Sequence, residues 1–169
     1  MLKRILLALD SSDSGQVAIS FTIALAGSDT EVRVLHINEL LLAGRAMTVE
    51  TPTEARFLLD DAVLQLRCCG VTATGVVATG VVATATCFAV AECIITEADR
   101  WSADAIVLGS ARRRGLRRIV SHGVRERVIR SSCLPVLTAP APLKVAHTDL
   151  APAPPAVPGH RGTISRLHH

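Results

Sequence analysis

The chain has 169 residues, a net charge of +3, and only three Phe, one Trp and no Tyr. This length suits one domain with its own core, and a core of Val, Ile, Leu and Ala suits parallel strands covered by helices on both faces. The scarcity of aromatic side chains argues against a stacking surface for single-stranded nucleic acid. The N-terminal MLKRILLALD reaches an acidic residue after five apolar ones. That run is too short for a signal peptide or a membrane span, so we expect a cytoplasmic protein with no membrane partner.

The first half of the chain alternates predicted strands and helices. Ile5–Leu9 is an apolar run that ends in Asp10, which is typical of a buried parallel strand whose end faces a ligand. Helical spacing of apolar residues follows over Gly15–Ala26, then a second strand over Val32–Ile37. After a stretch without an assigned element, Glu54–Cys69 is the next predicted helix, closed by glycine.

The second half begins with an immediate repeat. The five residues TGVVA occur at 74–78 and again at 79–83. One copy is predicted as the third strand, and the other extends that strand or forms the following loop. The remaining predicted elements are a helix, a strand, a helix and a strand, over Cys87–Trp101, Ala105–Leu108, His122–Ser131 and Val136–Thr138.

The composition changes from Pro140 onward. Six of the eight prolines lie in the last 30 residues, and no apolar periodicity remains. Such a segment buries too little surface to offset the entropy lost on ordering. We therefore predict a domain over residues 1–140 and a disordered tail over 141–169. The histidines of that tail are not predicted to bind a metal.

Strands that alternate with helices indicate right-handed crossovers and a parallel sheet, which is an α/β fold of three layers. In such sheets the ligand crevice lies beyond the carboxyl ends of the strands, where the strand order reverses. Asp10, Ile37 and Gly109 all fall at predicted strand ends. The sequence therefore predicts that three separate segments converge on one edge.

Positive charge is concentrated beside the last of these strand ends. Residues 109–130 hold eight Arg and one Glu, a local charge of +7, so the rest of the chain carries −4. A glycine turn followed by a helix N-terminus favours anion binding, because backbone amides and the helix dipole both face the ligand. The arginines are Arg112, Arg113, Arg114, Arg117, Arg118, Arg125, Arg127 and Arg130.

Three segments together resemble the universal stress protein family over about residues 1–140. They are ILLALDSSDSGQVAISFTIALA, VRVLHIN and ADAIVLGSARRRGLRRIVSHGVRERVIRSSCLPVLTAP. The resemblance implies a Rossmann-like nucleotide-binding fold, and we expect a five-stranded parallel sheet with strand order 3-2-1-4-5. It also implies a regulatory protein of the stress response that binds ATP or a related adenine nucleotide.

The nucleotide-binding members of the family look like G-x2-G-x9-G-[ST] in the last segment. Gly109 matches the first glycine, but Arg112 and His122 stand at the second and third, and Gly123 stands at the Ser/Thr position. The resemblance implies that Asp10 and Ile37 match positions that contact adenine and ribose. It implies phosphate-loop positions at Gly109, with its neighbour Ser110, and at Gly123 and Val124.

Two hypotheses stay open for this altered loop. Arg112 adds a side chain where backbone should approach phosphate, yet a guanidinium can also bind phosphate through two hydrogen bonds. The alternative is an empty loop with solvated arginines, in a protein-interaction module that needs no nucleotide or in a binder of polyanions. The cofactor predicted is ATP, with no metal beyond a nucleotide-bound Mg²⁺.

No catalytic constellation is predicted. The chain has no G-x-S-x-G elbow, no Walker lysine motif and no G-x-G-x-x-G. We expect no turnover beyond slow ATP hydrolysis at most. The short apolar strand Val136–Thr138 is of the type that pairs with a second copy, so a homodimer through strand five is expected. An unidentified protein partner is expected too, whereas nucleic acid is not favoured as a partner.

Overall fold

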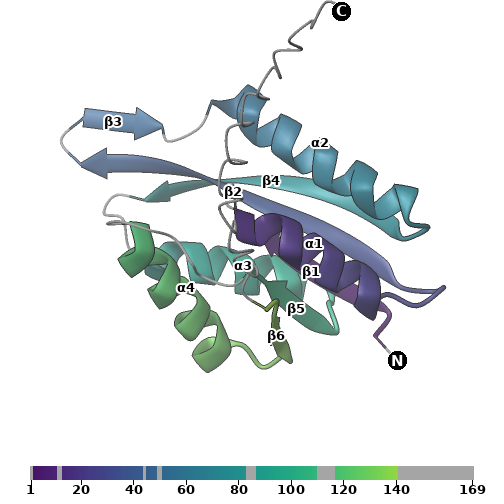
Figure 1. Ribbon diagram of the computed structural model, residues 1–169. Coiled ribbons are helices and arrows are strands. Elements are labelled where there is room, and N and C mark those ends of the chain that lie inside the picture. The colour runs from purple at the N-terminus through teal and green to yellow at the C-terminus, as the bar shows by residue number, and fades with distance from the viewer. Residues whose placement is uncertain are drawn as a thin grey trace, which may run out of the picture.

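The computed structural model describes most of the first 140 residues as strands and helices around one sheet (Figure 1). The strands are β1 (Arg4–Leu9), β2 (Glu31–Ala43), β3 (Arg45–Thr48), β4 (Thr72–Val82), β5 (Ala105–Leu108) and β6 (Val136–Thr138). The helices are α1 (Asp13–Leu25), α2 (Pro52–Cys68), α3 (Cys87–Trp101) and α4 (Arg117–Ser131). The described residues are 2–10, 13–43, 45–48, 51–82, 87–109 and 117–140.

The parallel part of the sheet has the order β4-β2-β1-β5-β6. Counted without β3, this is the order 3-2-1-4-5, so the predicted α/β fold is confirmed. The remaining strand, β3, is antiparallel to the end of β2 and pairs Leu40 with Thr48 through Ala43 with Arg45. It forms a hairpin that extends the carboxyl edge of the sheet.

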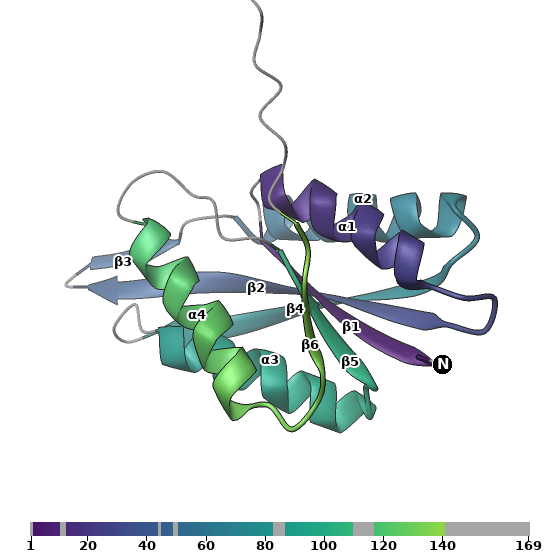
Figure 2. The ribbon, with the colours of Figure 1, turned by 60° about the horizontal axis from the view of Figure 1, so that its bottom comes forward.

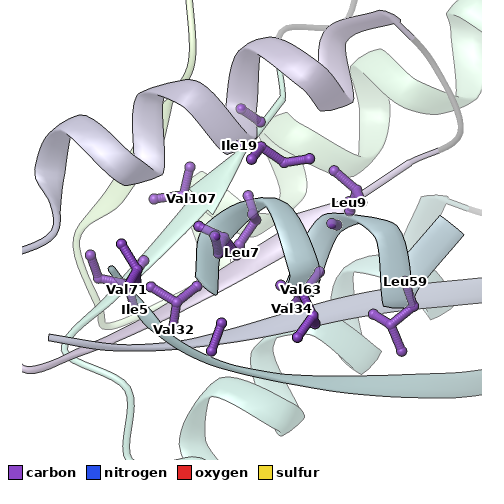
Figure 3. Close-up of a cluster of buried hydrophobic side chains, with 14 of the residues drawn as sticks. Ile5, Leu7, Leu9, Ile19, Val32, Val34, Leu59, Val63, Val71 and Val107 are labelled. Carbon is purple, nitrogen blue, oxygen red and sulfur yellow. The ribbon is translucent and has the colours of Figure 1, made fainter. Parts of the chain in front are cut away.

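The helices cover the sheet in two layers. Figures 1 and 2 show α1 and α2 on one face and α3 and α4 on the other. The first face buries alternate residues of β1, such as Ile5 and Leu7, against Ile19 of α1 and Leu59 of α2 (Figure 3). Leu6 and Ala8 face the opposite way, into the apolar cluster beneath α3 and α4. Successive side chains of β1 point to opposite faces of the sheet, and both faces are covered by helices. The strand is therefore apolar at every position.

Two predicted boundaries in the first half differ from the structure. The second strand continues from the predicted Ile37 to Ala43, and β3 follows it in a stretch that had no predicted element. The polar Asn38 and Glu39 interrupt the apolar run after Ile37, so the pattern indicated that the strand ends there. Helix α2 begins at Pro52, two residues before the predicted Glu54, because Thr51 caps it. The Thr51 side chain accepts from the Glu54 amide at 3.2 Å and the Thr51 amide donates to Glu54 at 2.8 Å, a capping box.

In the second half one alternative is confirmed and one boundary differs. The second copy of the repeat extends the strand, since both copies, as far as Val82, lie in β4. Helix α4 begins at Arg117 rather than at the predicted His122, five residues earlier. The helix runs through both His122 and the glycine that follows it, Gly123, so a glycine at this place does not mark its start. The predicted disordered tail over 141–169 lies outside the described residues.

No helix in the described segments is long and apolar enough to cross a bilayer. Four cysteines in the described part of the chain carry free thiols: Cys68, Cys69 and Cys133 are exposed, and Cys93 is partly buried. Burial and the nearby Glu97 carboxylate raise the pKa of the Cys93 thiol, since both disfavour a thiolate.

Candidate functional site

The strand order reverses between β1 and β5. From β1 the chain moves outward to β2 and β4, then returns to the other side of β1 to form β5 and β6. The helices that follow β1 and β5, α1 and α4, therefore lie on opposite faces of the sheet (Figure 2), and ligands of open α/β sheets bind beside such a reversal. This edge is the candidate site.

Strand register brings three predicted site residues to that edge. Leu9 pairs with His36 and Ala8 pairs with Leu108, so Asp10 lies beside Ile37, and Gly109 lies on the other side of Leu9. All three residues are partly exposed. Ile37 also packs against the core cluster under α3 and α4. The three residues therefore lie side by side as predicted, although Ile37 lies within β2 and not at its end. The binding roles of these residues stay predictions.

Contacts from β2 and from α1 fix the backbone at the end of β1. The Nδ1 atom of His36 lies 3.0 Å from the Leu9 carbonyl oxygen, and His36 is 3% exposed. Because a carbonyl only accepts, Nδ1 carries the proton and donates. From the other side, a Cβ added at Gly15 in the first turn of α1 would lie 2.9 Å from the Asp10 carbonyl oxygen. Glycine at this position lets α1 approach the end of β1.

Gly15 and His36 are supporting residues that the sequence analysis did not assign to the site. A glycine five residues after a strand-ending aspartate, next to a helix start, was the signal for a close backbone approach. His36 is a hydrogen-bonded core residue, since it is buried and contacts the Leu9 carbonyl. Its part in the site is to fix the backbone that carries Asp10.

The end of β5 is anchored by backbone on the opposite side. The Ala139 amide donates to the Leu108 carbonyl at 2.8 Å, which ties the residue before Gly109 to the end of β6. Gly109 thus follows a strand paired on both sides. Its own successors Ser110 and Arg112 lie outside the described residues.

The earlier start of α4 changes the setting of the predicted phosphate residues. His122, Gly123 and Val124 lie in the second turn of the helix, not at its beginning. The amides that lack an intrahelical partner in an α-helix are those of the first turn, here starting at Arg117. Anion binding by α4 amides would therefore involve residues earlier than the matched Gly123 and Val124.

The arginines of α4 do not all face one anion. Arg127 stacks on Phe88 of α3, with its guanidinium carbon 4.4 Å from the ring centroid. This contact turns one of the eight arginines toward the α3–α4 surface. Among the described residues, no group of three or more His, Cys, Asp or Glu side chains is placed to hold a metal ion.

Comparisons with known proteins agree with this architecture. A universal stress protein family member from Burkholderia pseudomallei is 26% identical, with a TM-score of 0.60 and 82% of this chain and 96% of that chain covered. A universal stress protein from Archaeoglobus fulgidus, solved in complex with dAMP, is 26% identical, with a TM-score of 0.58 and coverage of 81% and 97%. A family protein from Arabidopsis thaliana with AMP bound is 20% identical, with a TM-score of 0.58 and coverage of 87% and 97%.

Among curated proteins no match is found. The model of the universal stress protein family, in contrast, matches residues 1–140. That span contains every described strand and helix, including the edge with Asp10, Ile37 and Gly109. The chain therefore belongs to the universal stress protein family.

Proposed function

We propose that this protein binds an adenine nucleotide at the edge between β1 and β5 and acts as a regulatory protein of the stress response in the cytoplasm. The observation that carries the proposal is the register, which puts Asp10, Ile37 and Gly109 together where the strand order reverses. The dAMP bound to the Archaeoglobus fulgidus relative and the AMP bound to the Arabidopsis thaliana relative support the ligand class.

In this proposal Asp10 and Ile37 bind the nucleoside. The Asp10 carboxylate accepts hydrogen bonds from base or ribose donors, and the partly exposed Ile37 side chain supplies an apolar surface for the base. His36 and Gly15 contribute by fixing the backbone on which Asp10 stands. Because these residues come from β1, β2 and α1, the nucleoside half depends on strand register.

The phosphate half depends on the segment after β5. Gly109 allows close backbone approach, and Ser110, Arg112 and His122 are the proposed side-chain contacts, with Gly123 and Val124 behind them in α4. Since Gly123 and Val124 lie within a helix, most of the affinity comes from the nucleoside and the first phosphate. AMP, dAMP and ATP should then bind with similar affinity, and Mg²⁺ should matter only for ATP.

Calorimetric titration tests this proposal with AMP, dAMP and ATP, the last with and without Mg²⁺. Asp10→Ala should weaken all three by about tenfold, the amount expected from losing one charged hydrogen bond. The matched control is Asp104→Ala, which removes a carboxylate from the opposite edge of the sheet and should leave affinity unchanged. No binding at millimolar nucleotide, or equal losses in both variants, would contradict the proposal.

A second candidate function is docking of an acidic partner on α4. The exposed Arg127 and Arg130 and the partly exposed Arg125 give this helix a basic surface. A polyanion bound by charge alone would be displaced by salt, with affinity falling steeply between low and physiological ionic strength. Equal binding of mixed-sequence duplex and heparin, lost at high salt and unchanged by Asp10→Ala, would favour this function over nucleotide binding.

We also propose a homodimer through the outer edge of β6. Among the described strands β6 pairs only with β5, so its other edge is available to a second copy. The register of β6 with β5 turns the Leu137 amide toward β5 and the Thr138 amide toward the outer edge. Replacing Thr138 with Pro would remove an outer-edge donor, and sedimentation should then report a monomer. A dimer that survives this change would contradict pairing through β6.

A further inference from the structure

Strand β4 carries a repeat whose period does not match the two-residue period of a strand. Its residues pair in parallel with β2, from Thr72 opposite Glu31 to Val82 opposite Leu41. Among the described residues β4 pairs with no other strand, so it forms one edge of the sheet (Figure 2). Moving an edge strand along its neighbour breaks only one set of ladder bonds.

Packing under α2 fixes which residues β4 places inward. Val71 and Ala73 are buried, at 7% and 2% exposure. A Cβ added at Gly75 would lie 2.8 Å from Cγ and 2.9 Å from Cδ2 of Leu59, which is itself 2% exposed. The inward pattern is therefore Val, Ala, Gly at alternate positions, with glycine required beneath Leu59.

The same pattern occurs again five residues later. Val76, Ala78 and Gly80 repeat Val71, Ala73 and Gly75, and Thr79-Gly80-Val81-Val82 repeats residues 74–77. The only difference over seven positions is Val77 in the place of Thr72. A shift by an odd number of residues normally turns every side chain to the wrong face of a sheet. Here the repeat puts the same residue type back in six of the seven places.

We propose that β4 has a second register, in which residues 76–82 occupy the places of residues 71–77. Gly80 then lies beneath Leu59, Ala78 takes the buried place of Ala73, and Val76 takes that of Val71. The segment 71–75 joins the turn after α2. Val82 pairs with His36, and β2 loses its present β4 partners from Ile37 to Leu41.

Chain connectivity permits this shift in one direction only. Three residues separate Cys68 of α2 from Thr72, so the strand has no slack to advance toward its carboxyl end. Four residues separate Val82 from Cys87 of α3. Five strand positions amount to about 17 Å, which is the full extended length of the five peptide steps from Val82 to Cys87, so the shift also draws the first turn of α3 out of its helix. The shift thus transfers backbone from the site edge to the opposite edge.

The second register is a conformational device that acts on the carboxyl edge. It withdraws the described β4 partners from the part of β2 that leads from Asn38 to the base of the β2–β3 hairpin. A ligand seated on the observed edge would select the observed register, because only that register pairs β2 with β4 as far as this hairpin. The existence of the second register does not depend on nucleotide binding.

A double-mutant cycle on the two glycines tests the proposal without any ligand. Gly75→Val excludes the observed register because Leu59 fills the space, so the strand should shift and place Gly80 beneath Leu59. Gly80→Val should then shift the unfolding equilibrium roughly tenfold more in the Gly75→Val background than in the wild type. Residues so far apart on one strand otherwise behave additively, within about twofold in that equilibrium constant.

Gly15→Val is the matched control, because it also adds a side chain against backbone but has no repeated residue to replace it. Gly80→Val should have the same effect in that background as in the wild type. NMR contacts between the Leu59 methyl groups and residue 80 should appear in Gly75→Val, and amides 72–75 should lose protection from exchange. The milder Gly75→Ala serves if Gly75→Val does not fold. Additive glycine effects in both series, with no contact to residue 80, would overturn the second register.

Discussion

The amino edge and the carboxyl edge of the sheet differ in the contacts that the described residues make there. At the amino edge, a single carboxylate oxygen of Asp104 accepts from the Lys3 and Arg4 amides at 2.7 and 2.9 Å. Arg33 pairs with Glu97 at 3.0 Å while stacking over Trp101 at 4.7 Å. At the carboxyl edge, the backbone oxygens at the end of β1 are contacted from two elements. His36 contacts the Leu9 carbonyl, and Gly15 lies close to the Asp10 carbonyl.

This contrast would separate the contacts that stabilise the sheet from the edge at which we propose that a nucleotide binds. At the amino edge charged side chains close the sheet, with Glu97 buried between two arginines. At the carboxyl edge the backbone is fixed by a histidine and a glycine, and the neighbouring residues Asp10 and Ile37 are partly exposed. Trp101 belongs to the amino edge, so its fluorescence should report unfolding better than it reports nucleotide binding.

The largest effect should come from breaking the amino edge at Glu97. Glu97→Ala leaves the Arg33 guanidinium, whose Nε already has no hydrogen-bond partner among the described residues, without its carboxylate. We expect a loss of about 2–4 kcal/mol in the free energy of unfolding, measured by urea denaturation, because a partly buried charge is left unpaired. Arg100→Ala removes the exposed partner of Glu97 and should cost only about 0.5 kcal/mol. Equal costs would show that the pair with Arg33 is not what stabilises this edge.

The next largest loss of stability is expected at Gly15, on the carboxyl edge. Helix propensity alone predicts that Gly15→Ala stabilises α1 by about 1 kcal/mol. The added Cβ instead meets the Asp10 carbonyl, so we expect destabilisation of about 1–2 kcal/mol and weaker nucleotide binding, because Asp10 moves. Gln16→Ala, on the exposed side of the same turn, is the control and should be near neutral. A more stable Gly15→Ala protein would refute the close approach.

A smaller, pH-dependent effect is expected at Asp104. The two backbone amides that donate to its carboxylate lower its pKa below the ordinary value of 3.8. A lowered folded-state pKa adds stability above the unfolded-state pKa, and this stability disappears as pH falls through the folded-state value. Asp104→Asn should therefore lower the thermal midpoint at pH 7. The difference between the two midpoints should shrink as the pH falls below about 3.8 and disappear below the folded-state pKa of Asp104. A constant difference at all pH values would exclude this linkage.

The smallest effect concerns thiol reactivity and leaves the fold intact. The raised pKa of Cys93 reduces its thiolate fraction at pH 8, and partial burial limits access of reagent. Alkylation followed by mass spectrometry should modify the exposed Cys68, Cys69 and Cys133 first and Cys93 last. Glu97→Gln removes the neighbouring charge and should speed alkylation of Cys93 relative to Cys133. Unchanged relative rates would assign the difference to access alone.

Much of the carboxyl edge was predictable because it follows from strand ends. The apolar run before Asp10 and the run before Gly109 were correctly assigned as strands, so their ends had to meet at one edge of a parallel sheet. The β2–β3 hairpin and the true start of α4 were not predictable in this way. The polar Asn38 and Glu39 interrupt the apolar run of β2, and the first residues of α4 follow a basic stretch with no apolar spacing that marks a helix start.

The sequence by itself determined the α/β class, the strand order with the family resemblance, and the positions of Asp10 and Gly109 directly after strands. These features rest on local periodicity and on chain order, which a single sequence records. Only the tertiary structure decided that Gly15 and His36 fix the backbone around Asp10, that Glu97 holds Arg33, and that Leu59 demands glycine in β4. Each of these is a contact between segments distant along the chain, whose distances are set by packing rather than by any local pattern.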